Sequence, residues 1–299
     1  MSAAIEQALA LVRERRPDSI DKALALLQNT VFSFSMKVCG HPEDAEDTMQ
    51  EVLLKSIPHL PRFESPRALA VWLYKVARNR CISNRRGQKN SAAKNIPLAD
   101  LMPDSRELSE LLSKTPNPEA AALNRESSER VRQAVTAVPP AYRMVLVLHD
   151  MEELSTAEVA KVTGLREGTV RVRLHRARLL VRRYLADLAR GVEPGSLALH
   201  AVAERGRSQR RCRGLFAALS DYMDGLVDEA RCEEMDRHIN QCEPCRAFLL
   251  SLKQAVAQCR SYAPDCVSRH GDELRQELVL KYQQAVASLE KARSQAIPD

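Results

Sequence analysis

The spacing of His238, Cys242 and Cys245 constrains the fold of this chain more than any other feature. His238 and Cys242 lie one helical turn apart, so their side chains share a face. Cys245 follows at a spacing that lets two thiolates bind one metal ion. Imidazole and thiolate ligands together select zinc, and a fourth ligand closes a tetrahedron. Either Cys212 or Cys232 could be that ligand. A filled site has no open position for water, so we expect one structural or redox-sensing Zn²⁺.

The placement of the eight cysteines favours metal over disulfides. Six lie between Cys212 and Cys266, and only Cys39 and Cys81 lie in the first half. The sequence has neither a transmembrane segment nor a signal-peptide core. We therefore expect a cytoplasmic chain without a membrane partner, whose thiols stay reduced. Cys259 and Cys266 could form a disulfide, add ligands or remain thiols.

The composition favours helices. Aromatic residues make up 4% of the chain, and Gly occurs only 10 times among 299 residues. Ala, Leu, Glu and Arg, which are good helix formers, are abundant. Segments rich in Pro, Gly and small polar residues interrupt the helical patterns. We predict an all-α protein with helical domains at 1–90, 125–190 and 212–255, linkers at 91–124 and 191–211, and a tail at 256–299. An amphipathic helix in that tail is expected to pack on its own chain.

The pattern between Glu153 and Arg183 predicts a helix-turn-helix. Ser155 followed by Glu158 is a capping box, which starts a helix. Gly164 ends that helix, because a left-handed turn suits Gly. A second helix begins near Glu167, with apolar residues at helical spacing. A short helix, a turn at Gly and a longer helix are typical of this motif.

The second helix of this motif is strongly basic. The span 166–183 holds seven Arg, one His and one Glu. A basic run by itself also fits a solvated surface or an acidic protein partner. Together with the capping box and the Gly turn, it predicts a helix in the DNA major groove. The expected DNA-binding residues are Arg166, Thr169, Arg171, Arg173, His175, Arg176 and Arg178.

Two helices in the first domain carry opposite charges. Residues 43–51 include five acidic groups, which favour a helix N-terminus. Its apolar side leaves Asp44, Asp47, Gln50 and Glu51 largely exposed, which by itself fits a solvated face. The next helix, 67–84, has an apolar stripe that is expected to place Trp72 in the core. The basic span 66–89 suits nucleic acid. Its expected contact residues are Lys75, Arg78, Asn79, Arg85 and Arg86.

Three stretches resemble the extracytoplasmic-function sigma factors of the sigma-70 superfamily. Asp44-Ala45-Glu46-Asp47-Thr48-Met49-Gln50-Glu51-Val52 is similar to region 2.2, and Trp72-Leu73-Tyr74-Lys75-Val76-Ala77-Arg78-Asn79 to regions 2.3–2.4. The span 138–183 is similar to region 4. The resemblance implies that the acidic helix binds core RNA polymerase at the clamp helices of the β′ subunit, with the β subunit as a further partner. It also implies binding to the −10 promoter element through 67–84, with help from the loop 61–65, and to the −35 element through region 4.

The span from Cys212 to Cys245 resembles a zinc-binding anti-sigma domain of the zinc-finger type. This resemblance, and not spacing, places Cys212 instead of Cys232 at the fourth ligand position. The whole pattern implies an alternative sigma factor with no catalytic residues, regulated in cis by a zinc domain that responds to metal or redox state. The carboxylates expected to face the basic helix are Asp221, Asp224, Asp228, Glu229, Glu233 and Glu234.

Three other functions compete with this interpretation. A helix-turn-helix regulator without sigma activity would leave the acidic helix unexplained. A zinc-dependent nucleic-acid enzyme would need an open metal position with a Glu base nearby, against the four-ligand count. A protein that regulates another sigma factor would bind polymerase without promoter-specific transcription.

Overall fold

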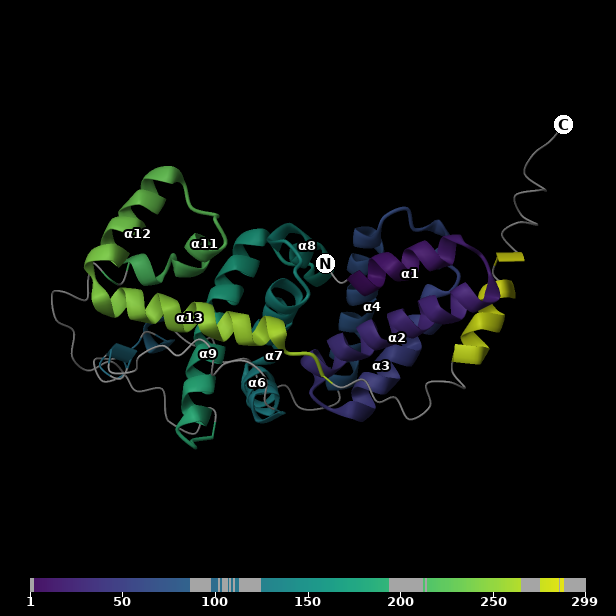
Figure 1. Ribbon diagram of the computed structural model, residues 1–299, viewed down its shortest axis with the longest axis horizontal. Helices are drawn as coiled ribbons and strands as arrows, with labels where there is room; N and C mark the ends of the chain where they lie inside the picture. The colour runs from purple at the N-terminus through teal and green to yellow at the C-terminus, as the bar shows by residue number, and fades with distance from the viewer. Residues whose placement is uncertain are drawn as a thin grey trace. The chain divides into compact units, whose positions relative to one another are not determined.

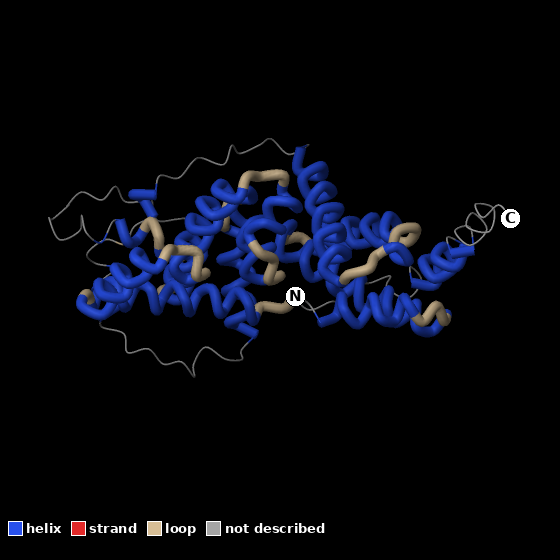
Figure 2. Tube along the Cα trace, turned by 90° about the horizontal axis from the view of Figure 1, so that it is seen from above, coloured by secondary structure: helices blue, strands red, loops and turns tan. Residues whose placement is uncertain are grey.

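The computed structural model describes residues 3–86, 98–101, 103, 107, 109, 111–112, 125–193, 212, 214–264, 275–284 and 286–287. All regular elements among these residues are helices, as Figure 2 shows. This confirms the all-α prediction. Within the same residues, no helix combines the length and the apolar character that crossing a bilayer requires.

The chain forms two compact units that do not follow its linear order. Unit 1 comprises Met1–Asn90, Glu152–Gly164 and Ala263–Asp299, and unit 2 comprises Ser91–Met151 and Leu165–Tyr262. The boundary passes through the turn of the helix-turn-helix, so its two helices belong to different units. The domain boundaries expected from the sequence stay a prediction.

Unit 1 is built on four helices, α1 (Ala3–Arg13), α2 (Pro17–Cys39), α3 (Pro42–Ser56) and α4 (Pro66–Arg86), with the short helix η1 (Leu60–Arg62) before α4. α2 packs against the other three long helices (Figure 1). It ends at Gly40, whose φ of 83° is left-handed and lets the chain turn at once into α3. Phe34 and Tyr74 meet in the core, with ring centroids 4.6 Å apart.

Two later segments complete unit 1. α8 (Thr156–Thr163) packs against α4. Ser155 and Glu158 form the expected capping box, and Gly164 follows with a φ of 70°. Residues 275–284 are helical, with Leu278 and Tyr282 buried, and Arg275 lies 3.5 Å from Asp21 of α2.

Unit 2 is organised around α9 (Glu167–Ala189). The short helix η2 (Leu98–Leu101), α6 (Arg125–Ala137) and α7 (Pro140–Leu146) pack against it, and the π-helical turn η4 (Val147–Met151) continues α7. Three further helices belong to the predicted zinc domain: α11 (Leu219–Met223), α12 (Glu229–Gln241) and α13 (Glu243–Ser261). α11 and α13 pack directly on α9, while α12 packs on α13 (Figure 1). Phe216, just before α11, makes an edge-to-face contact with Phe248 of α13, with ring centroids 4.9 Å apart.

Candidate metal, polymerase and DNA sites

A cluster of one histidine and three cysteines lies where α12 meets α13. His238 is in the last turn of α12, Cys242 lies at the junction, and Cys245 is in the first turn of α13. Cys212, at the start of the domain, places its Sγ beside these three side chains. The four ligand atoms all lie within 4.8 Å of one another. His238 Nε2 is 3.3 Å from Cys245 Sγ and 3.6 Å from Cys212 Sγ, which suits ligands gathered around one ion.

The chemistry of these thiols fits a cation. Burial raises the pKa of the Cys212 thiol, and burial with neighbouring thiols raises the pKa of Cys245 well above its usual range. A divalent ion would reverse this trend, because thiolates form readily beside positive charge. The Cys232 Sγ instead lies 3.8 Å from Asp236 Oδ2 and is outside the cluster. The cysteines that the structure describes form no disulfide, and Cys266 is outside the described residues.

The exposed part of α9 comprises residues 166–173, beginning at the N-cap Arg166, and presents three of the seven predicted DNA-binding residues of this motif to solvent. Arg166, Thr169 and Arg171 are exposed. Arg173 and Arg176 are half-buried, and Arg176 Nη1 donates a hydrogen bond to the hydroxyl of Tyr142 at 3.3 Å. This exposed part of the helix combines solvent exposure with positive charge, as a groove-binding surface requires.

The covered part of α9 comprises residues 174–182, which are buried apart from half-buried Arg176. The Arg178 side chain is fully buried. It donates hydrogen bonds to Asp150 at 2.5 and 2.8 Å, and to Asp224, which follows α11, at 2.8 and 2.9 Å. Burial opposes the charge of Asp150, but hydrogen bonds from Arg178 and His149 outweigh it and lower the pKa of Asp150 to about 2. Arg178 therefore joins the zinc domain to the core of unit 2.

His175 is buried beside this ion pair. Its Nδ1 lies 2.9 Å from Ser220 Oγ on α11. Burial and the charges of Arg178 and Arg176 lower the pKa of His175 to about 4, so the ring is neutral at pH 7. His175 and Arg178 were expected to contact DNA, but in unit 2 neither faces solvent. Both lie on the side of α9 that packs against α11.

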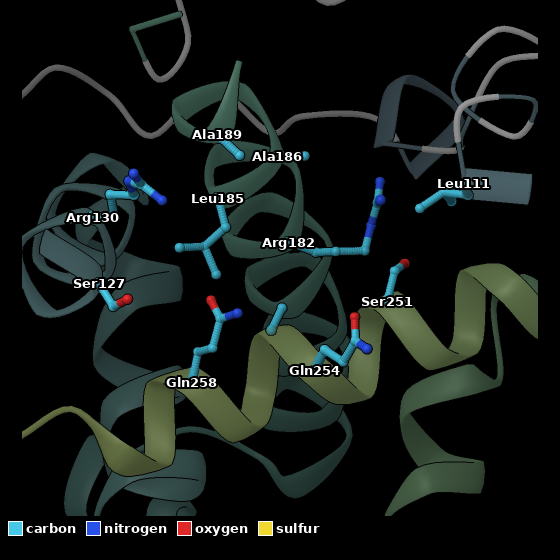
Figure 3. Close-up of a pocket in the computed structure, with 11 residues that line it drawn as sticks. Leu111, Ser127, Arg130, Arg182, Leu185, Ala186, Ala189, Ser251, Gln254 and Gln258 are labelled. Carbon is cyan, nitrogen blue, oxygen red and sulfur yellow. The ribbon is translucent and has the colours of Figure 1, made fainter. Parts of the chain in front are cut away.

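α13 packs over the C-terminal end of this covered part, at Arg182. The Arg182 guanidinium stacks on the Phe248 ring at 4.2 Å, and its Nη2 pairs with Glu107. A cavity of about 260 Å³ remains between α6, α9 and α13. Figure 3 shows Arg130, Arg182 and Gln258 around it. The contact between the zinc domain and α9 thus combines apolar, aromatic and ionic packing.

The acidic helix α3 is only partly free of contacts. Asp47 is exposed, whereas Asp44 and Gln50 are half-buried. Glu51 accepts a hydrogen bond from Lys55 at 2.6 Å, which lowers its pKa, and pairs with Arg80 of α4 at 2.9 Å. The sequence pattern predicted the helix and its acidic face, but not this link to α4.

The basic helix α4 exposes Lys75 and Asn79, and half-buried Arg78 donates a hydrogen bond to Asn79. The side chains of Arg85 and Arg86 lie outside the described residues. Trp72 is half-buried instead of fully in the core. Its ring lies 5.5 Å from that of His59 and 5.9 Å from that of Phe63, two aromatic residues that the sequence reasoning missed.

Comparison with known families assigns the same three segments. Sigma-70 region 2 matches residues 24–91, Sigma-70 region 4 matches 128–181, and a putative zinc-finger family matches 212–246. The chain is 26% identical over 188 residues to the ECF RNA polymerase sigma factor SigW of Bacillus subtilis, covering 63% of this chain and 100% of the relative. These matches show an alternative sigma factor whose two sigma regions are similar to those of the extracytoplasmic-function sigma factors.

Two further relatives are also sigma factors of the extracytoplasmic-function type. The ECF RNA polymerase sigma factor SigE of Mycolicibacterium smegmatis is 28% identical over 170 residues, covering 56% of this chain and 62% of the relative. The ECF RNA polymerase sigma-E factor of Escherichia coli is 28% identical over 138 residues, covering 45% of this chain and 70% of the relative. As a sigma factor, the chain is a transcription initiation factor of a family that binds core RNA polymerase and promoter DNA.

The matches fall on the surfaces described above. In this sigma factor, region 2 spans α3 and α4, and region 4 spans both helices of the helix-turn-helix. The zinc-finger match includes Cys212, His238, Cys242 and Cys245. Sequence reasoning missed Asp150, Ser220 and Phe248, which link region 4 to the zinc domain.

Proposed function

We propose that this sigma factor binds core polymerase through α3 and directs it to promoters through α4 and the exposed part of α9. The acidic helix would dock on the clamp helices of the β′ subunit, with the β subunit as a further partner. α4 would bind the −10 element and α9 the −35 element. The observation that carries this proposal is that one chain has both an exposed acidic residue, Asp47, and two separate basic surfaces.

Asp47 gives the sharpest test of polymerase binding. Glu51 is less suitable, because reversing its charge would also break its pairs with Lys55 and Arg80. Asp47→Lys should weaken a pull-down with core polymerase while leaving helicity by circular dichroism unchanged. Glu6→Lys, an equal charge change at an exposed position of α1, is the control. Equal retention of core polymerase by both variants would remove α3 from the interface.

We further propose that Cys212, His238, Cys242 and Cys245 hold one zinc ion. The compact cluster and the zinc-finger match over 212–246 support this ligand set. When bound, zinc supplies a structural cross-link between the start of the domain and the α12–α13 junction. Oxidation of the thiols would release it, because a sulfur that has formed a disulfide no longer ligates metal as a thiolate.

The zinc domain would act as a restraint on region 4. Asp224 binds Arg178, and burial raises the pKa of Asp221 while the charge of Arg171 opposes that rise. These carboxylates thus lie beside arginines that DNA would otherwise attract, where they repel phosphate. The linker 191–211 tethers the domain, so its effective concentration is about millimolar and a weak contact suffices. Loss of zinc would shift the population toward a released state.

A further inference from the structure

A buried, hydrogen-bonded ion pair joins residues that are far apart in the chain. Lys37 of α2 donates from Nζ to Glu152 Oε1 at 2.9 Å. Tyr74 of α4 donates its hydroxyl to Glu152 Oε2 at 2.6 Å. All three side chains are less than one-tenth exposed. Because burial of a carboxylate is costly unless it is paired and hydrogen-bonded, these contacts hold Glu152 strongly in place.

Glu152 belongs to region 4, whereas both of its partners belong to region 2. It lies just before α8, the first helix of the helix-turn-helix, and α8 packs against α4. A second ion pair, between Arg67 of α4 and Glu158 of α8, supports the same contact nearer to solvent. Region 2 thus holds the first helix of region 4 in unit 1.

This contact is incompatible with the promoter-bound arrangement, and the argument rests on the proposed function. The −10 and −35 elements are about 25 base pairs apart, which is about 85 Å of B-form duplex. α8 must travel with region 4 to the −35 element, while α4 stays at the −10 element. We propose that Lys37, Glu152 and Tyr74 form a latch that keeps region 4 on region 2 and must open before both elements are bound.

The latch can be tested in the full-length protein without DNA. Spin labels carried by non-canonical amino acids at Ala68 of α4 and Lys161 of α8, both exposed, report the separation of the two helices and leave the cysteines intact. Lys37→Met leaves Glu152 buried without its cation, so the ratio of separated to latched molecules should rise at least about tenfold. Tyr74→Phe should raise it less. This variant keeps the ring contact with Phe34, which guards against a general loss of packing.

Lys281→Met is the matched control, because Lys281 forms an exposed ion pair within its own helix. It should leave the label distances at wild-type values. Wild-type distances in both Lys37→Met and Tyr74→Phe would overturn the latch, as would widely separated labels in the wild-type protein.

Run-off transcription separates this inference from the proposed function. If the variants open but neither they nor the wild-type protein support transcription, the sigma assignment fails and the latch stands. If the wild-type protein transcribes and no latch variant changes the label distance, the latch fails and the sigma assignment stands.

Discussion

The two basic helices α4 and α9 look alike in the sequence, yet the structure treats them differently. α4 keeps Lys75 and Asn79 exposed. α9 divides into its exposed part, residues 166–173, and its covered part, residues 174–182, where Arg178 is fully buried. A single run of arginines therefore has two environments, one exposed to solvent and the other in contact with the zinc domain.

The difference arises from what packs on each helix. The covered part of α9 meets two carboxylates, Asp150 from region 4 and Asp224 from the zinc domain, which compensate the burial of Arg178. Charge density alone therefore does not identify a DNA-binding surface, because a buried carboxylate can turn an arginine into a structural residue.

Removal of zinc should produce the largest contrast between α9 and α4. Structural zinc contributes an apparent binding free energy of about 10–16 kcal/mol in zinc-finger peptides. Cys212→Ser should lose the metal, measured by elemental analysis, and hydrogen exchange should rise in α11–α13 and α9 but not in α4. Cys232→Ser is the matched control and should keep one zinc per chain. Metal loss in Cys232→Ser with retention in Cys212→Ser would reverse the ligand assignment.

A pH titration should distinguish the covered part of α9 through His175. Its folded pKa of about 4 lies below the ordinary 6.5. Between these values the unfolded chain binds a proton that the folded chain does not, so stability falls as pH drops from 6.5 to 4. The loss should approach about 3 kcal/mol per chain at the low end. Urea unfolding of the wild-type protein and His175→Gln, which lacks the titrating ring, should diverge across this window. Parallel curves would contradict a neutral, buried His175.

A substitution in the exposed part of α9 should have a smaller effect, which changes DNA binding but not stability. Arg171→Ala should cost about 1–3 kcal/mol at a cognate −35 element if it contacts a base, or weaken all sites alike if it contacts phosphate. Promoter titrations at several salt concentrations distinguish these two outcomes. Lys253→Ala, an exposed charge on α13, should leave affinity and salt dependence unchanged. Unchanged affinity and salt dependence in Arg171→Ala would exclude the exposed part of α9 from the DNA interface.

Sequence reasoning predicted features that depend on local pattern. The capping box at Ser155, the left-handed Gly164 and the grouping of His238, Cys242 and Cys245 follow from short-range spacing, whereas Cys212 was placed by family resemblance. It missed features that depend on distant partners. Nothing near Arg178 in the sequence indicates that Asp224 will bind it, and nothing near Glu152 points to Lys37. The sequence pattern likewise predicts neither the π-helical turn at Val147–Met151 nor the left-handed φ of 58° at Glu153.

The central claim is that the zinc domain restrains region 4 by binding the covered part of α9. The direct measurement is run-off transcription by the zinc-loaded, full-length Asp224→Lys variant, which places a cation against Arg178. Glu229→Lys makes the same charge change at an exposed position of the same domain. The account predicts that Asp224→Lys transcribes more than the wild-type protein and no longer responds to chelator, while Glu229→Lys matches the wild type. Equal transcription by all three proteins, with and without chelator, would contradict it.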